Sequence, residues 1–259
     1  MITSRANAKI KWVRGLQARR AEREAAGVFV VEGVRLLEEA AHSAAPAHLV
    51  LHTADLDTRG RAAVEALKQQ GAPVEAVTPE VMAAASDAQS PPGLLAVVPL
   101  PRLPLPAPLT FALVLDRLGD PGNLGTVLRT AAAAGVQAVF LTPGTVDPYN
   151  PKVVRAAMGA HFHLPLVAAD WAALPAHLAG LDLWRAESGS GLAYDAVDWR
   201  RPCALLIGAE ASGPGDQARA LAPQAVHIFM PGPTESLNAA LAAGILLFEA
   251  ARQRRQRII

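Results

Sequence analysis

The sequence predicts an α/β protein in which a parallel-sheet domain follows a smaller α/β domain. Continuous apolar runs at residues 110–116, 136–141, 203–208 and 226–230 alternate with helix-like segments. Such runs between helices are typical of a parallel sheet that is covered on both faces. Five prolines in residues 99–109 precede the first run. Because proline has a fixed φ and no backbone N–H, this stretch predicts an extended linker.

The linker divides the chain into a first domain at residues 1–98 and a second domain at residues 110–259. In the first domain we expect a basic helix over residues 4–26, a second helix around Glu38 and a third near residues 58–70. The strands expected in this domain lie at residues 28–32, 48–52, 73–77 and 93–99.

The composition excludes several classes of protein. Of 259 residues, 51% are hydrophobic and the net charge is only +1, whereas a disordered chain has low hydrophobicity and high net charge. The single cysteine, Cys203, cannot pair within the chain, which excludes a disulfide scaffold. No apolar run reaches the roughly 18 residues of a membrane-spanning helix, and the first residues lack the apolar segment of a signal peptide. We therefore expect a cytoplasmic protein with no membrane partner.

Positive charge is concentrated at the two ends of the chain. Residues 1–23 carry a balance of +6 and residues 250–259 a balance of +4, which leaves −9 for the residues between them. Clustered Lys and Arg neutralise phosphates and release counterions, so this distribution suggests a nucleic-acid partner, although solvated helix faces also carry such runs. The candidate RNA-binding residues are Arg5, Lys9, Lys11, Arg14, Arg19 and Arg20.

Polar loops follow the strands of the second domain, and ligands of open parallel sheets bind beside such loops. After the first apolar run, a turn at residues 120–122 leads into a helix that we expect over residues 123–134, with Asn123 as its N-cap. Arg129 lies six residues after Asn123, nearly two turns into the helix. Such a helix N-terminus can hold an anion, but an ordinary turn with a surface arginine fits the loop as well.

The second loop, at residues 205–216, opens from a buried strand. Gly208, Gly213 and Gly215 permit close backbone approach to a ligand, and Glu210 is the carboxylate placed directly at the strand end. The loop contains neither the phosphate-loop pattern nor the dinucleotide fingerprint. This absence disfavours a kinase or a simple nucleotide-dependent dehydrogenase.

The third loop follows a strand that we expect to end at Met230. A rigid bend at residues 231–233 leads through Ser236 and Asn238 into a long apolar helix. Backbone N–H groups freed by such a turn could grip a planar ligand, and the alternative is a simple helix cap.

Together, the loops resemble the motifs of the SpoU family of RNA ribose 2′-O-methyltransferases, part of the SPOUT superfamily. The matching residues are Asn123, Gly125 and Arg129; 207–210 with Gly213; Met230, Gly232 and 235–238; and the further segments 147–155 and 158–160. The resemblance covers residues 110–251. The first hundred residues more loosely resemble the L30e-like RNA-binding domain of these enzymes, through residues 4–9, 29–33 and 93–97.

The resemblance implies a C-terminal trefoil knot, S-adenosyl-L-methionine as cofactor, no metal, and a homodimer to which the final helix could contribute. The implied catalytic residues are Asn123, Arg129, Glu210, Ser236 and Asn238. The implied cofactor-binding residues are Leu141, Thr142, Gly144, Ile207, Gly208, Met230, Ser236 and Leu237.

The family assigns removal of the 2′-OH proton to Arg129, but a guanidinium stays protonated in proteins. We therefore expect Arg129 to clamp a phosphate and stabilise the alkoxide, while an RNA phosphate helps to remove the proton. Ser236 and Asn238 would orient the ribose and Arg129, and Glu210 would fix either Arg129 or the third loop. The N-terminal domain favours ribosomal over transfer RNA as the substrate.

Other interpretations stay open. A tRNA ribose 2′-O-methyltransferase, a non-catalytic RNA-binding protein of the same fold and a nucleotide-dependent oxidoreductase are the alternatives. His161 and His163 would face one side of a strand, but no third ligand of suitable spacing accompanies them, so we expect no metal site. Residues 188–191 fit either a flexible active-site loop or an ordinary surface turn.

Overall fold

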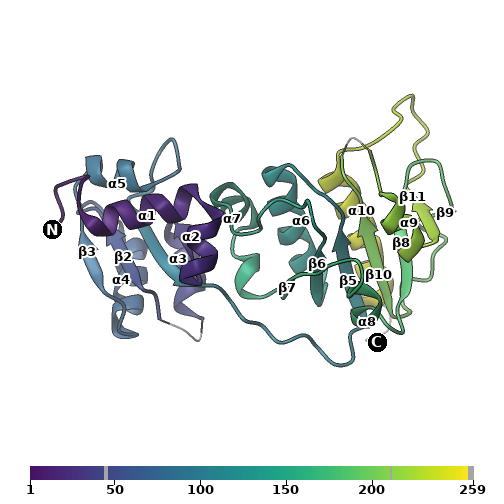
Figure 1. Cartoon of the computed structure of the whole chain (residues 1–259), viewed down its shortest axis with the longest axis horizontal. Coiled ribbons are helices and arrows are strands. Elements are labelled where there is room, and N and C mark those ends of the chain that lie inside the picture. Colours follow the sequence, from purple (N-terminus) through teal and green to yellow (C-terminus); the bar gives the residue numbers. More distant parts are fainter. Residues whose placement is uncertain (44–45, 211, 256–259) are drawn as a thin grey trace. The chain divides into compact units, whose positions relative to one another are not determined.

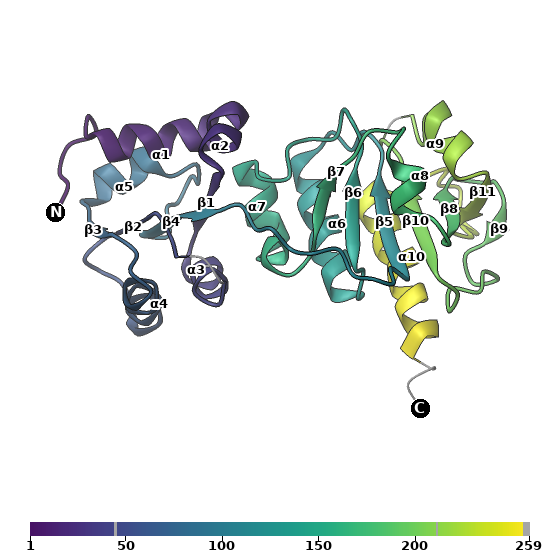
Figure 2. The same cartoon turned by 60° about the horizontal axis from the view of Figure 1, so that its bottom comes forward.

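The computed structural model describes residues 1–43, 46–210 and 212–255, and Figures 1 and 2 show it from two directions. The chain forms two compact units. Unit 1 contains Met1–Pro101 and Tyr149–Phe162, whereas unit 2 contains Arg102–Pro148 and the described part of His163–Ile259. The segment Tyr149–Phe162 belongs to the second domain by sequence, yet it packs with unit 1.

Two helices, not one, form the basic N-terminal segment. α1 (Ala8–Ala18) and α2 (Arg20–Ala26) are separated by Arg19, whose backbone is extended. The buried Arg23 accounts for the break, because its guanidinium donates to the carbonyl oxygen of Leu16 at 2.5 Å. Such a carbonyl is available only where a helix ends. The expectation of one continuous helix was therefore wrong.

Unit 1 is built on a four-stranded sheet with the order β1-β4-β2-β3. β4 (Leu94–Pro99) is antiparallel to β1 (Val28–Glu32) and to β2 (Leu49–His52), and β3 (Val74–Ala76) is parallel to β2. All four strands lie where the sequence predicts them.

Alternate side chains of this sheet are buried on opposite faces. Phe29 and Ala96 belong to a core cluster with α3 (Val34–Ala41) and α4 (Thr58–Gln69). Val30 and Val97 belong to a second cluster with α1 and α5 (Pro79–Ala85), a helix that the sequence analysis missed. Because both faces are covered, the strands read as continuous apolar runs.

The segment Tyr149–Phe162 adds α7 (Pro151–Ala157) and a 3-10 helix (Ala160–Phe162) to unit 1. Val154 is buried in the cluster of α3 and α4, and the ring centroid of Tyr149 lies 5.1 Å from that of Phe29. His161 is buried in the 3-10 helix. His161 and His163 therefore do not lie on a strand, the arrangement in which they would have faced one side.

The sheet of unit 2 is parallel throughout, with the order β7-β6-β5-β10-β8-β11-β9. This confirms the predicted α/β class and parallel sheet. Its strands are β5 (Phe111–Leu115), β6 (Ala138–Leu141), β7 (Leu166–Ala168), β8 (Asp182–Ala186), β9 (Leu192–Ala193), β10 (Cys203–Ile207) and β11 (Gln224–His227).

Three of these strands were not expected, and one ends earlier than expected. β7 and β9 are only three and two residues long. β8 contains Asp182, Trp184 and Arg185, so it does not read as an apolar run. β11 ends at His227, three residues before the expected end at Met230.

Helices cover both faces of this sheet (Figure 2). α6 (Pro121–Ala133) and α10 (Ala239–Arg255) pack against each other on one face. α8 (Leu174–His177) and α9 (Asp216–Leu221) share a core cluster with β5 and β10 on the other face. β11 lies near one edge of the sheet, and the chain then returns to α10, which packs beside α6.

Candidate active site

The first strand-end loop leads from β5 into α6. Asp120 caps this helix, because its carboxylate accepts a hydrogen bond from the backbone N–H of Asn123 at 2.7 Å. Pro121 takes the first helical position, where its fixed φ suits the helix and no N–H is needed. The expectation that Asn123 caps the helix was therefore wrong, and its side chain is available for other contacts.

A series of hydrogen bonds joins the three loops through Asn123. Its Nδ2 donates to Oε1 of Glu210 at 3.1 Å, and its Oδ1 accepts from Nδ2 of Asn238 at 3.0 Å. Glu210 also accepts from the backbone N–H groups of Gly119 and Asp120, both at 3.4 Å. The structure thus brings together three of the five expected catalytic residues, one from each loop.

Both ends of this series fix its direction. A carboxylate only accepts, so Glu210 requires the Nδ2 of Asn123 and turns the Oδ1 of Asn123 toward Asn238. At the other end, Oδ1 of Asn238 accepts from the backbone N–H groups of Ala240 (2.9 Å) and Leu241 (3.2 Å) and so caps α10. Each amide therefore has one orientation that satisfies all of its partners.

The surroundings of Glu210 keep it ionised. Burial raises the pKa of its carboxyl, but hydrogen bonds from Asn123 and from nearby backbone N–H groups outweigh burial and hold the pKa below its ordinary value. The charged form accepts the hydrogen bonds from the first loop most strongly, so ionisation of Glu210 and the position of that loop support each other.

Arg129 and Ser236 take no part in this hydrogen-bond series. Arg129 is exposed on α6 and forms no hydrogen bond or ion pair with any other residue that the structure describes. Glu210 therefore holds Asn123 and not Arg129 in this structure. Ser236 lines a cavity that Glu210 also borders.

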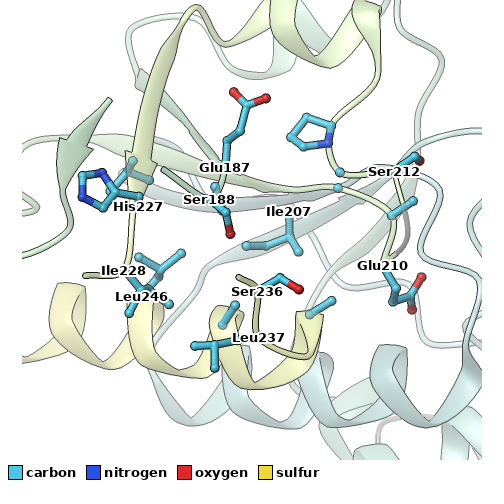
Figure 3. Close-up of a pocket in the computed structure, with 18 of the residues that line it drawn as sticks. Glu187, Ser188, Ile207, Glu210, Ser212, His227, Ile228, Ser236, Leu237 and Leu246 are labelled. Carbon is cyan, nitrogen blue, oxygen red and sulfur yellow. The ribbon is translucent and has the colours of Figure 1, made fainter. Parts of the chain in front are cut away.

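This cavity of about 320 Å³ lies where β8, β10 and β11 end (Figure 3). Pockets of such size with apolar walls and a few polar groups are typical of small-molecule sites. Five of the eight expected cofactor-binding residues line it: Ile207, Gly208, Met230, Ser236 and Leu237. Further lining residues are Ala186, Glu187, Ser188, Glu210, Ser212, Arg219, His227, Ile228 and Leu246.

The other three expected residues, Leu141, Thr142 and Gly144, do not line this cavity. β6 is separated from β10 by β5, and the hydroxyl of Thr142 donates to the buried Asp116 at 3.3 Å. Residues 186–188, after β8, border the cavity instead. The polar and glycine-rich stretch at residues 187–191 was the available signal, but the strand before it was not recognised.

One wall of the cavity is the backbone of the loop after β10. A Cβ at Gly208 would lie 2.2 Å from the backbone nitrogen of Pro214 and 2.3 Å from the carbonyl carbon of Gly213. Only glycine fits in such a space. The backbone N–H of Gly213 donates to the carbonyl of Ala209 at 2.8 Å, which closes the loop.

Asp116, which the sequence analysis did not select, connects this loop to the first one. Its buried carboxylate accepts from the backbone N–H of Gly215 at 2.9 Å and from Nε of Arg117 at 3.1 Å. A buried carboxylate at a strand end has no periodicity or spacing that distinguishes it in a sequence.

No cluster of three His, Cys, Asp or Glu side chains suited to a metal ion is found within residues 1–43, 46–210 and 212–255. In the same described residues, no helix has the length and apolar character needed to cross a membrane.

A family model described as the SpoU rRNA methylase family matches residues 110–248, more than half of the chain. The chain belongs to this family. Among its relatives, the 23S rRNA (guanosine(2553)-2′-O)-methyltransferase RlmP of Bacillus subtilis is 32% identical, over 95% of this chain and 97% of the relative. The 23S rRNA (uridine(2479)-2′-O)-methyltransferase of Streptomyces viridochromogenes is 33% identical, over 98% of this chain and 92% of the relative.

Solved structures of SpoU proteins have a similar fold. The SpoU methyltransferase AviRb from S. viridochromogenes, in complex with the cofactor AdoMet, gives a TM-score of 0.86 at 30% identity. The match covers 96% of this chain and 98% of that chain. An rRNA methyltransferase from Sinorhizobium meliloti gives a TM-score of 0.85 at 28% identity, and the match covers 97% of this chain and 96% of that chain.

A second family model, an MRM3-like substrate-binding domain, matches residues 7–96 of this SpoU protein. The six expected RNA-binding residues are all exposed within this region or beside it. Lys9, Arg19 and Arg20 form ion pairs with Glu75, Glu22 and Glu24. Arg5, Lys11 and Arg14 form no ion pair with the described residues. Arg257, of the basic C-terminal tail, lies outside the described residues.

Proposed function

We propose that the chain is an S-adenosylmethionine-dependent methyltransferase that modifies a ribose 2′-OH of ribosomal RNA. The observation that carries this proposal is the hydrogen-bond series Glu210–Asn123–Asn238, which joins three loops beside a ligand-sized cavity. A protein that only bound RNA would not need these residues in one satisfied arrangement. The names of the relatives, which are 23S rRNA 2′-O-methyltransferases, support the same substrate class.

The cavity has the right chemistry for the cofactor. Ile207, Leu237 and Leu246 offer apolar walls for an adenine ring, and Gly208 lines the cavity beside them. Met230 and Ser236 complete the proposed cofactor-binding set, while Leu141, Thr142 and Gly144 lie outside this cavity. When bound, S-adenosylmethionine supplies a methyl group on a positively charged sulfonium, a donor that needs no metal.

The protein's contribution is position and charge. In-line transfer needs the ribose oxygen held opposite the leaving group, and fixed side chains provide this alignment. Asn123 and Asn238 are fixed by their hydrogen bonds, and Ser236 projects into the cavity to orient the ribose (Figure 3). Arg129 stays protonated, clamps an RNA phosphate and stabilises the developing alkoxide. The 2′-OH proton passes to an RNA phosphate oxygen.

The substrate-binding role belongs to unit 1 in this proposal. Arg5, Lys11 and Arg14 are exposed cations without an ion pair in the described residues, so they are available to phosphates. Lys9, Arg19 and Arg20 would exchange their carboxylate partners for RNA. The same proposal includes an L30e-like fold for the first domain and domain boundaries at residues 98 and 110. It also includes a cytoplasmic location, because ribosomal RNA is found there.

We also propose a trefoil knot and a homodimer. The knot is supported by the position of β10 between β5 and β8 and by the return of the chain to α10 beside α6. The dimer is supported by an exposed apolar strip on α10. Leu241 and Phe248, two turns apart, are 55% and 53% exposed and line a groove that also contains Asn123.

Sedimentation of a Phe248→Glu variant tests the dimer. A buried glutamate without a partner is strongly unfavourable, so this variant should sediment as a monomer. Leu192→Glu is the matched control, since Leu192 is 50% exposed on β9 and does not line the groove. A monomeric wild-type protein, or a dimer that persists in the Phe248 variant, would contradict the proposed interface.

Calorimetry and a methylation map test the function. The wild-type protein should bind S-adenosylmethionine and not NADH, which separates a methyltransferase from an oxidoreductase. Total RNA from a deletion strain should lack ribose methylation at one or more rRNA positions and regain it on complementation. Loss at a tRNA position alone would favour the tRNA alternative. Unchanged maps would favour a non-catalytic RNA-binding protein.

A further inference from the structure

A second charged group borders the cavity, on a different side from Glu210 (Figure 3). Glu187, directly after β8, accepts hydrogen bonds from two arginines. Arg185 Nε lies 2.9 Å from Oε2, and Arg219 donates to Oε1 from Nη2 at 2.6 Å and from Nε at 3.2 Å. Burial raises the pKa of Glu187, but these hydrogen bonds outweigh burial and lower it. Two cations therefore share one anion, which leaves an excess charge of +1.

The two arginines differ in where their remaining donors lie. The side chain of Arg185 is only 13% exposed, and its Nη1 donates to the backbone carbonyls of Ala222 (2.8 Å) and Pro223 (2.5 Å). Arg185 thus donates to Glu187 and to two backbone carbonyls, and it does not line the cavity. Arg219 is 45% exposed and lines the cavity. Glu187 engages two of its five N–H donors, and the other three have no partner among the described residues. The excess positive charge therefore faces the cavity.

The proposed cofactor carries one group that matches this charge. The only anionic group of S-adenosylmethionine is the carboxylate of its amino-acid tail. Among the described residues that line the cavity, Arg219 is the only lysine or arginine. A guanidinium is planar and presents parallel N–H groups, so it binds a carboxylate through two hydrogen bonds. The side with Glu210 and Ser236 offers no cation to this carboxylate.

We propose that Arg219 binds the carboxylate of the cofactor's amino-acid tail and that Glu187 is the positioning residue that holds Arg219 at the cavity. This inference rests on the proposed function, because it takes S-adenosylmethionine as the cofactor. Glu187 restricts Arg219 to one orientation before the ligand arrives, so less side-chain entropy is lost on binding. Residues 185, 187 and 219 thus form a tail-recognition subsite that is separate from the Glu210–Asn123–Asn238 series.

Two ligands that differ only in the tail test this assignment by calorimetry on the full chain without RNA. S-Adenosylhomocysteine carries the amino-acid tail, and 5′-methylthioadenosine lacks it. Arg219→Ala should weaken binding of S-adenosylhomocysteine by about ten- to a hundredfold, the range expected for a charge-assisted hydrogen bond. Binding of 5′-methylthioadenosine should change less than about twofold. Arg219→Lys keeps the charge but not the paired N–H donors of the guanidinium, so its loss of affinity for S-adenosylhomocysteine should be intermediate.

The controls separate a local effect from unfolding. Arg200 is a matched control, because it is an exposed arginine of unit 2 with a carboxylate partner, Asp198, and does not line the cavity. Arg200→Ala should leave the affinity for both ligands unchanged. Glu187→Gln should weaken the binding of S-adenosylhomocysteine less than Arg219→Ala does, because it frees Arg219 without removing it.

Each other outcome overturns the inference. Equal weakening of both ligands by Arg219→Ala would mean that Arg219 only supports the cavity. Unchanged affinity for both, with weaker RNA binding, would assign Arg219 to an RNA phosphate. A wild-type protein that binds neither ligand would refute the proposed function itself, which is a distinct result.

Discussion

Asn238 has two separable roles, and two substitutions should divide them. Its Oδ1 caps α10 by accepting from the backbone N–H groups of Ala240 and Leu241, and its Nδ2 donates to Asn123. Asn238→Ala removes both functions. Asn238→Asp keeps an acceptor at the helix N-terminus, where a negative charge is also favourable, but it removes the donor. Alanine should therefore reduce both stability and activity, whereas aspartate should reduce mainly activity.

The expected changes in stability follow from these contacts. Loss of an N-cap costs about 1 kcal/mol, so Asn238→Ala should lower the melting temperature by about 2–4 °C for a unit of this size. In Asn238→Asp, a carboxylate replaces the donor that lies 3.0 Å from Oδ1 of Asn123. Asn123 cannot rotate its amide to compensate, since its Nδ2 is bound to Glu210 at 3.1 Å. Loss of this exposed hydrogen bond costs about 0.5–1.5 kcal/mol, and the charged cap offsets the loss in stability.

Thermal unfolding and tritium incorporation into unmodified rRNA measure the two effects. Asn238→Asp should melt within about 2 °C of the wild type, bind S-adenosylhomocysteine, and transfer methyl groups at least about tenfold more slowly. The reasoning is refuted if aspartate retains full activity, because the direction of the hydrogen-bond series would then be irrelevant. It also fails if both variants lose activity in proportion to stability, which would leave Asn238 as a cap alone.

Three further outcomes are expected. Arg129→Ala should abolish methyl transfer and leave the affinity for S-adenosylhomocysteine within about twofold, measured by single-turnover assay and calorimetry; equal loss of both in a folded variant would contradict the assigned role. Gly208→Ala should destabilise unit 2 by more than about 2 kcal/mol and abolish cofactor binding, because its Cβ would meet backbone atoms of Gly213 and Pro214. A variant that unfolds at the same urea concentration as the wild type would contradict this. The pKa of Glu210 is lowered on folding, so its contribution to stability is present above its unfolded pKa of about 4.5 and is lost as the pH falls. The difference in stability between wild type and Glu210→Gln should therefore shrink below about pH 4.5, and a difference that is constant with pH would exclude this linkage.

Sequence reasoning was most successful where a strand is buried on both faces. β5, β6 and β10 read as apolar runs because each is covered by helices on both sides, and the loops after β5 and β10 could be located from them. β8 has intermediate burial along its length and carries Asp182 and Arg185, so the same criterion missed it. Residues 188–191, after β8, were therefore left open as an active-site loop or a surface turn, and Glu187 was not selected; Glu187 and Ser188 line the cavity.

Specific side-chain contacts, both local and between loops, could not be predicted from the sequence pattern. The break after α1 depends on Arg23 reaching back to the carbonyl of Leu16, a contact that no periodicity encodes. The cap of α6 was misassigned because Asp120 and Asn123 are both good capping residues, and only the proline between them decides which one is used. The resemblance to SpoU proteins selected Asn123, Glu210 and Asn238 as catalytic residues, but the hydrogen bonds that join them emerge only from the structure.

The packing of Tyr149–Phe162 with unit 1 has a consequence for chimaeric enzymes. Val154 and the ring of Tyr149 complete the cluster around Phe29, although they are encoded between two strands of the other unit. A chimaera that exchanges only residues 1–98 between relatives would place a foreign α7 against a native core, or the reverse. Unit 1 must therefore be exchanged as two discontinuous segments, and the second is fourteen residues long.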